Sequence, residues 1–165
     1  MKIESIVGDI TRQADCDAIV NAANPMLLSG AGVAGAIHRA AGRELEKYCE
    51  EFAPIDVGQA VLSPGFNLPN AAVIHALGPK YFHDANPEAN LAKAIDSVLY
   101  LANAHQFNSI ALPAISTGSY GFPISEAASI IVDRLMAWDM SYPTVVRLVL
   151  FDEKAYEVFE SKISK

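Results

Sequence analysis

Six short runs rich in Ile, Val, Leu and Ala recur along the chain, separated by segments with helical spacing. The apolar runs predict strands at residues 3–7, 18–20, 60–62, 71–76, 109–115 and 145–151. The intervening segments predict helices at residues 33–41, 43–52, 88–105, 125–138 and 153–162. This alternation is typical of a parallel sheet covered by helices on both faces. We therefore expect an α/β protein, a three-layer α/β/α sandwich around a mixed, mostly parallel sheet.

Composition narrows the classes of protein that this chain can belong to. A length of 165 residues with 52% hydrophobic content predicts one core, and so a single domain over residues 1–165. The net charge of −7 argues against general nucleic-acid binding, which needs a basic surface. The N-terminus has no long uninterrupted apolar h-region, and no apolar run approaches about 18 residues, so we expect neither export nor a membrane-spanning segment. We expect a cytoplasmic monomer.

Two glycine-rich segments are the strongest functional signal. They cover residues 30–35 and 116–122, and each follows a predicted strand and precedes a predicted helix. Such loops present bare backbone N–H groups and a helix N-terminus to an anion. The carboxyl ends of neighbouring parallel strands meet at one edge of a sheet, so both loops could line one crevice. Because main-chain donors need no Lys or Arg, the acidic composition is compatible with a nucleotide diphosphate as ligand.

Other interpretations of the two loops are weaker. Gly30, Gly32 and Gly35 have the spacing of a dinucleotide fingerprint and would suggest an NAD-dependent oxidoreductase. In that motif the first glycine directly follows the strand, whereas residues 24–29 intervene here. No Lys follows the glycines, so an NTPase phosphate loop is not indicated. Ser116 lies in a degenerate nucleophile elbow, but all four histidines precede it, whereas that triad places His last.

Metal and cofactor chemistry have little support in the sequence. The two cysteines, Cys16 and Cys49, have no C-x-x-C spacing, and the histidines have no metal-ligand spacing. We therefore expect no metal and no cofactor.

Two residues at predicted strand ends leave two interpretations open. Asp9 could accept a hydrogen bond from the amino group of a nucleobase, or it could cap a turn. Phe151 could stack on a base, although core packing is the commoner role of a single Phe.

Five segments together resemble a macrodomain, the ADP-ribose-binding module, and in particular the bacterial stand-alone branch close to the O-acetyl-ADP-ribose deacetylases. The match spans nearly the whole chain. The segments that carry it read VGDIT at residues 7–11, IVNAAN at 19–24, GVAGAIHRAAG at 32–42, VIHALGP at 73–79 and PAISTGSYGF at 113–122.

The resemblance implies a role for each matching position. Asp9 would accept the adenine amino group, Ile10 would contact the ring, and Phe151 would cover it. The two glycine loops would wrap the diphosphate, while Asn24, Gly32 and Phe122 would act at the distal ribose. The residues implied to contact the ligand are Asp9, Ile10, Asn24, Gly30, Ala31, Gly32, Val33, Ala34, Ser116, Thr117, Gly118, Ser119, Tyr120, Gly121, Phe122 and Phe151.

One position departs from many hydrolytic members of that branch. They carry an Asp directly after the Val of the first glycine loop, where this chain has Ala34. A carboxylate there would activate water as a general base. Other branches with Gly-Val-Ala-Gly are hydrolytic and are proposed to hold the water with the substrate's own phosphate and a loop amide. Two hypotheses follow: a hydrolase of O-acetyl-ADP-ribose or mono-ADP-ribosyl proteins, or an ADP-ribose reader without turnover.

Overall fold

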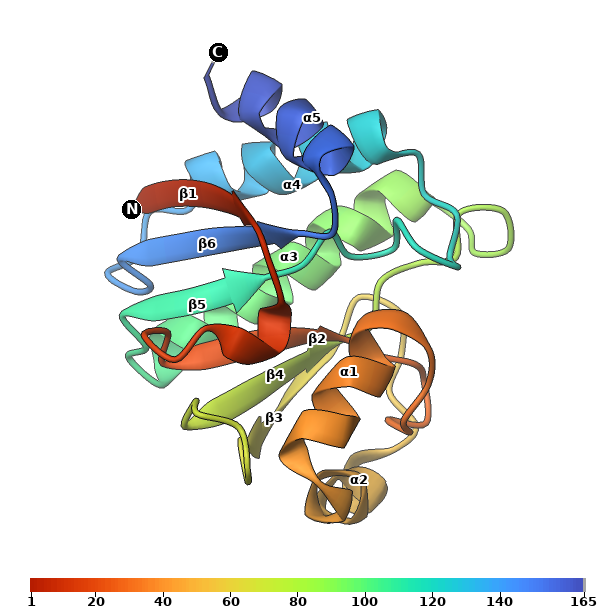
Figure 1. Ribbon diagram of the computed structural model, residues 1–165. Coiled ribbons are helices and arrows are strands. Elements are labelled where there is room, and N and C mark those ends of the chain that lie inside the picture. The colour runs from red at the N-terminus through yellow and green to blue at the C-terminus, as the bar shows by residue number, and fades with distance from the viewer. Residues whose placement is uncertain (165) are drawn as a thin grey trace.

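The computed structural model describes residues 1–164, which form one six-stranded sheet with the strand order β1-β6-β5-β2-β4-β3 (Figure 1). The strands are β1 (Lys2–Val7), β2 (Ala18–Ala22), β3 (Ala60–Pro64), β4 (Ala72–Ala76), β5 (Ser109–Leu112) and β6 (Val145–Leu150). Every neighbouring pair is parallel except β3 and β4. The predicted mixed, mostly parallel sheet is therefore confirmed.

Helices cover both faces of the sheet (Figure 1). They are α1 (Gly32–Ala41), α2 (Arg43–Cys49), α3 (Pro87–Ala104), α4 (Ile124–Ala137) and α5 (Glu153–Ile163), with 3-10 turns η1 (Ile10–Arg12) and η2 (Glu50–Phe52). Alternate strand residues face opposite layers: Ala18 and Val20 of β2 pack with α3, α4 and α5, whereas Ile19 packs with α1 and α2. The result is the expected three-layer sandwich.

The strand predicted over residues 109–115 ends earlier in the structure. β5 stops at Leu112, and the next residue, Pro113, has no N–H to donate to a ladder. The chain then turns, with the Ile115 N–H donating to the Pro113 carbonyl at 2.9 Å. This early stop frees Ser116 and the residues after it to form a loop at the carboxyl end of the sheet.

A buried polar cluster joins β2, β3 and β4 beneath α1. The His75 ring lies between Asn21, whose Nδ2 is 3.0 Å from His75 Nδ1, and Ser63, whose Oγ is 2.8 Å from His75 Nε2. All three side chains are buried. Burial, with a smaller contribution from nearby His38, lowers the pKa of His75 to about 3. The imidazole is therefore neutral at physiological pH.

This cluster predicts an acid-sensitive fold. The pKa of His75 lies below the ordinary value of about 6.5, so between pH 6.5 and about 3 the unfolded chain binds more protons than the folded one. The contribution of neutral, buried His75 to the free energy of unfolding is complete above about pH 6.5, and it is lost as the pH falls from there toward about 3. At pH 5 the expected loss is about 2 kcal/mol in free energy of unfolding. Urea titrations at pH 7 and pH 5 measure it.

The matched variants are His75→Gln and His105→Gln, the latter at an exposed histidine. His75→Gln is expected to flatten the pH dependence, and His105→Gln is expected to leave it as in the parent protein. If the free energy of unfolding of His75→Gln still fell with pH as in the parent protein, the acid sensitivity would not come from His75.

Candidate functional site

Both glycine-rich loops leave the same edge of the sheet. The first joins β2 to α1 and the second joins β5 to α4. Because β2 and β5 are parallel neighbours, the two loops emerge side by side at their carboxyl ends (Figure 1). The structure thus brings together two segments that are about ninety residues apart in the sequence.

The first loop is shaped by glycines that no larger residue could replace without strain. A Cβ added at Gly35 would overlap the carbonyl oxygen of Gly30. Gly32 has φ +60°, in the left-handed region that favours glycine. The N-cap of α1 is Ala31, which has no side chain to satisfy the helix N-terminus. The N-terminus of α1 is therefore open to an external acceptor.

Several backbone N–H groups of the two loops have no hydrogen-bond partner among residues 1–164. Within residues 1–164, the N–H groups of Gly30 and Ala31 in the first loop and of Gly118, Ser119 and Tyr120 in the second donate no hydrogen bond. A Cβ added at Gly118 would meet nothing within 4 Å. Five exposed main-chain donors at the ends of two adjacent strands form a ready anion site.

Hydroxyl groups contribute less to the second loop than the sequence suggests. Thr117 Oγ1 donates to the Ala114 carbonyl at 2.7 Å, inside the loop. Ser116 has φ 69° and is buried against Gly78, and its Oγ has no partner among residues 1–164. A non-glycine residue in this conformation costs about 1 to 3 kcal/mol, a strain that is often stored at functional sites. The accessible donors of this loop are its backbone amides.

Asn24 holds the turn that leads into the first glycine loop. Its Nδ2 donates to the Leu28 carbonyl at 2.7 Å, and its Oδ1 accepts from the Leu28 N–H at 2.9 Å. Nδ2 lies 3.6 Å from where a Cβ of Gly30 would stand, so the amide is beside the loop. One N–H and one lone pair of this amide remain for a ligand.

Asp9 combines the two roles that the sequence left open. It caps η1, with Oδ1 accepting from the N–H of Thr11 at 2.9 Å and from its hydroxyl at 2.7 Å. The Thr11 side-chain hydrogen bond, followed by the backbone one, lowers the pKa of Asp9. Oδ2 has only Arg12 Nε nearby, at 3.8 Å. The carboxylate is therefore ionised, with one oxygen available to an external donor.

A chain of hydrogen bonds fixes Asp9 from beneath. Gln13 is buried, and its Nε2 donates to the Asp9 carbonyl at 2.8 Å. Arg147 on β6 donates a hydrogen bond to Gln13 Oε1 at 3.0 Å. Its guanidinium also donates two hydrogen bonds of 2.7 Å to the Asp15 carboxylate. The η1 turn is therefore tied to a central strand.

Phe151 is not a core residue. Its side chain is 93% exposed at the end of β6, the neighbour of β1, after which Asp9 follows. The Gly8 N–H donates to the Leu150 carbonyl at 3.1 Å, which brings the two strand ends together. The core reading of Phe151 is wrong for this structure, and an exposed ring beside a free carboxylate oxygen suits a nucleobase.

Phe122 is a predicted contact residue whose ring the structure buries. Its ring is 2% exposed and packs edge to face on Tyr81, 4.8 Å between centroids, in the layer of α3 and α4. Because the ring is almost fully buried, this structure exposes little of it to a sugar, and the predicted contact stays a prediction. Tyr120 is half-buried and packs with the opposite layer, which contains Val33 of the first glycine loop. Tyr120 is therefore the aromatic residue of this loop that packs on the α1 and α2 side of the sheet and keeps part of its surface exposed.

Residues beyond the predicted set line one flank of the second loop. A cavity of about 340 Å³ is bordered by Lys80, Phe82, His83, Ser119, Tyr120 and Gly121. Lys80 Nζ lies 5.4 Å from the centre of the Tyr120 ring, and the Tyr81 N–H donates to the Tyr120 carbonyl at 2.9 Å. Lys80, Phe82 and His83 belong to a polar and aromatic segment at residues 78–87 that lies outside the two glycine loops.

The described part of the chain holds neither a metal-ligand cluster nor a membrane-spanning helix. Among residues 1–164, no group of three or more His, Cys, Asp or Glu side chains is placed to hold a metal ion. In the same part of the chain, no helix combines the length and apolar character that crossing a membrane requires.

Known proteins resemble this chain over most of its length. The family model described as Macro domain matches residues 20–131. The chain is 45% identical to an O-acetyl-ADP-ribose deacetylase of Klebsiella pneumoniae, over 94% of this chain and 93% of that protein. It is 44% identical to a macro domain-containing protein of Mesorhizobium japonicum, over 96% of this chain and 91% of that protein.

Solved structures give the same picture. The Oceanobacillus iheyensis macrodomain with ADP superposes with a TM-score of 0.93 and 38% identity, over 98% of this chain and 90% of that one. The Trypanosoma brucei macrodomain in complex with ADP-ribose superposes with a TM-score of 0.88 and 34% identity, over 96% of this chain and 65% of that one.

Proposed function

Since this chain belongs to the macro domain family, we propose that it binds ADP-ribose and hydrolyses ADP-ribose conjugates. The substrate class is esters of the distal ribose, either O-acetyl-ADP-ribose or mono-ADP-ribosylated protein carboxylates. The cytoplasmic location and the monomeric state expected from the sequence remain predictions.

The observation that carries this proposal is the set of five free N–H groups between the two loops. They match a ligand with two linked phosphates, because each phosphate presents several acceptor oxygens and needs no cationic side chain when amides and a helix N-terminus surround it. The chain has an overall negative charge, so a local main-chain site is the means by which it can hold a diphosphate.

The remaining ligand parts fit on either side of the diphosphate. We place the adenine between Asp9, the Ile10 backbone and the exposed Phe151 ring, all at the ends of β1 and β6. We place the distal ribose at the other end, beside Asn24 and Tyr120. The order of the strands supports this arrangement, because β5 lies between β6 and β2.

Hydrolysis then needs an oriented water and a stabilised oxyanion. Water attacks the acyl carbon and loses a proton, the bond between the acyl carbon and the ribose oxygen breaks, and that oxygen takes up the proton to give the ribose hydroxyl and a free carboxylic acid. Asn24 aligns the ribose, and the loop amides stabilise the charge that develops. Because Ala34 offers no carboxylate, the water is activated by a phosphate oxygen of the substrate and a loop amide.

Because Ala34 supplies no general base, the alternative hypothesis is a module that binds ADP-ribose without hydrolysing a conjugate. Turnover is therefore tested directly. The protein is incubated with O-acetyl-ADP-ribose and with a mono-ADP-ribosylated acidic peptide, and ADP-ribose release is followed by chromatography. We expect release well above that of a Gly118→Glu variant at the same concentration. Tight binding with release no faster than in the variant would leave only the reader function.

The adenine placement predicts a large effect of Asp9→Ala. This change removes a charge-assisted hydrogen bond worth about 1.5 to 3 kcal/mol, so the dissociation constant for ADP-ribose should rise roughly 10- to 150-fold. Calorimetry with AMP and IMP adds a specific readout, because IMP lacks the amino group. The parent protein should prefer AMP, and Asp9→Ala should not.

Asp133→Ala serves as the matched control, because Asp133 is an exposed carboxylate on α4 with no bonded partner among residues 1–164. It should leave the affinity unchanged. An Asp9→Ala variant that still prefers AMP to IMP would refute the adenine assignment.

A further inference from the structure

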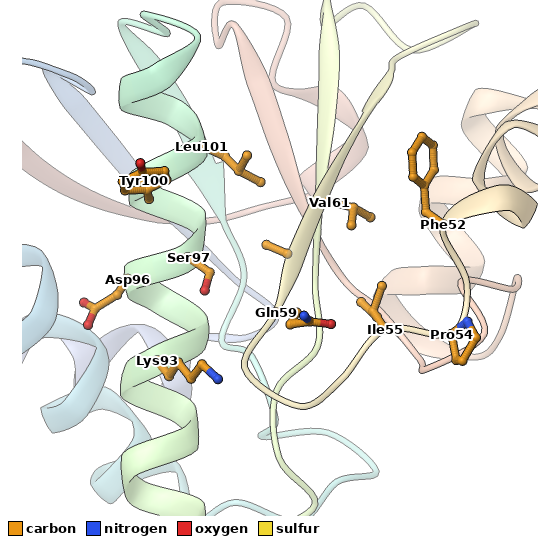
Figure 2. A pocket seen from close by; sticks show the side chains of 11 residues that line it. Phe52, Pro54, Ile55, Gln59, Val61, Lys93, Asp96, Ser97, Tyr100 and Leu101 are labelled. Atoms are coloured by element: carbon orange, nitrogen blue, oxygen red, sulfur yellow. The ribbon is translucent and has the colours of Figure 1, made fainter.

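A second cavity, of about 580 Å³, lies between α3, the start of β3 and residues 52–55 (Figure 2). Its floor is formed by three consecutive residues, Gln59, Ala60 and Val61. Successive side chains of a strand point to opposite faces of the sheet, so a cavity over one face would be lined by alternate residues. This cavity therefore runs along the edge of the strand, and we call it the β3 slot.

The floor of the β3 slot is an open sheet edge. Within residues 1–164, β3 pairs with β4 alone, in antiparallel register. The carbonyl of Gln59 accepts from the N–H of Leu77, just after β4, at 3.0 Å, and the N–H of Gly65 donates to the carbonyl of Ala71, just before β4, at 3.1 Å. The backbone groups of the odd-numbered residues of β3 are therefore the ones directed at β4. The backbone groups of Ala60 and Leu62 are therefore directed away from β4. Pro64, which has no N–H, ends this open stretch.

The walls of the slot come from opposite faces of the sheet. Tyr100 and Leu101 of α3 form one wall, in the layer of α3 and α4, and Phe52 and Ile55 form the other, in the layer of α1 and α2 (Figure 2). Tyr100 is 69% exposed. The slot thus combines backbone groups directed away from β4 at its floor with apolar side chains on both walls, and Lys93, Asp96 and Ser97 make the rest of the α3 wall polar. This is the chemistry that an extended peptide strand satisfies, since its backbone pairs with the edge and its alternate side chains enter the walls.

Charge around the slot selects among possible occupants. Glu50 and Glu51 directly precede Phe52, Asp56 directly follows Ile55, and all three are exposed. Of the charged residues that line the slot itself, Lys93 is cationic and Asp96 is paired with Arg134, so the three exposed carboxylates outweigh Lys93. Two copies of this chain paired edge to edge would bring these carboxylates together in a protein of net charge −7. A segment with basic residues beside an apolar stretch would instead be attracted to this rim.

We propose that the β3 slot binds an extended polypeptide segment of a partner protein, apolar at alternate positions and flanked by Lys or Arg, which adds a strand beyond β3. This goes beyond the proposed function and does not depend on it. The slot lies close to the ligand crevice, because the Ile55 N–H donates at 2.9 Å to the carbonyl of Pro25, the residue after Asn24.

Amide hydrogen exchange of the full chain, followed by NMR, tests the proposal. The probe is the acetylated and amidated peptide Lys-Lys-Val-Thr-Val-Thr-Val-Lys-Lys. At saturating peptide, exchange of the Ala60 and Leu62 N–H groups should slow by about tenfold or more, as for amides that enter a ladder. The N–H groups of Val61 and Ser63, already paired with β4, should change little. The same peptide with N-methylated valines, and one with Glu in place of Lys, should not protect them.

Two variants test the floor and the wall separately. Ala60→Pro removes an outward N–H without touching the ladder to β4, and Tyr100→Ser trims the exposed wall, with Tyr100→Phe as its control. Ala60→Pro and Tyr100→Ser should weaken peptide binding and leave ADP-ribose affinity unchanged.

The proposal is overturned if the N–H groups of Ala60 and Leu62 stay unprotected at millimolar peptide, or if the N-methylated peptide binds equally. Protection that rises with protein concentration alone would assign the edge to a second copy. Peptide binding without ADP-ribose binding would refute the proposed function and leave this inference standing.

Discussion

A Gly118→Glu variant is expected to lose ADP-ribose binding and keep its fold. A Cβ at Gly118 meets nothing within 4 Å, so the longer side chain enters open space rather than the core. Its carboxylate would then lie among the free N–H groups of Gly118, Ser119 and Tyr120, where we place the diphosphate. The introduced carboxylate would accept hydrogen bonds from these N–H groups and would repel the diphosphate. Together the two effects should weaken ADP-ribose binding about 100-fold or more.

Calorimetry with ADP-ribose measures the loss, and a thermal unfolding curve checks the fold. Gly118→Gln has nearly the same size without the charge, so it separates repulsion from bulk and should bind better than Gly118→Glu. Gly32→Glu is a less clean test, because φ at Gly32 is +60° and any side chain there is strained. Normal affinity in a folded Gly118→Glu protein would show that the phosphates bind elsewhere.

An Ala34→Asp variant is expected to hydrolyse O-acetyl-ADP-ribose faster, by about 100-fold if water activation limits the rate. Ala34 is the third residue of α1, where a carboxylate is favoured by the helix dipole. A Cβ of Gly30 would stand 4.0 Å from the Ala34 Cβ and 3.6 Å from Asn24 Nδ2, so a carboxylate at this position would lie on the Asn24 side of the loop. Saturating turnover, kcat, is the quantity to measure.

Ala34→Asn matches the Asp in size but cannot take up a proton, so it should give no gain. A rate unchanged in Ala34→Asp, or raised equally in Ala34→Asn, would contradict the idea that a missing base limits this protein. In that case the substrate phosphate and loop amide already supply the water activation.

The architecture could be predicted from the sequence because it depends on local periodicity. Near-continuous apolar runs and helical spacing predict the order of the strands and helices. The strand predicted over residues 109–115 ends at Leu112 instead, and the cause, Pro113, is also local. The glycine loops were predictable for the same reason, since glycine spacing and flanking elements are visible along the chain.

Side-chain placement in the site could not be predicted in the same way. Phe122 and Tyr120 are two residues apart on one loop, yet Phe122 packs in the layer of α3 and α4 while Tyr120 packs in the layer of α1 and α2. The same loop contains Ser116 with φ 69°, a left-handed backbone conformation that its residue type does not signal. The bracing of Asp9 by Arg147 through Gln13 also depends on partners far apart in sequence.

A crystal structure of the protein soaked with ADP-ribose tests the central claim most directly. The account predicts diphosphate oxygens within hydrogen-bonding distance of the N–H groups of Gly30, Ala31 and Gly118 to Tyr120, with the adenine against Phe151. A crevice without ligand at saturating concentration, or a diphosphate held by cationic side chains away from both loops, would contradict it.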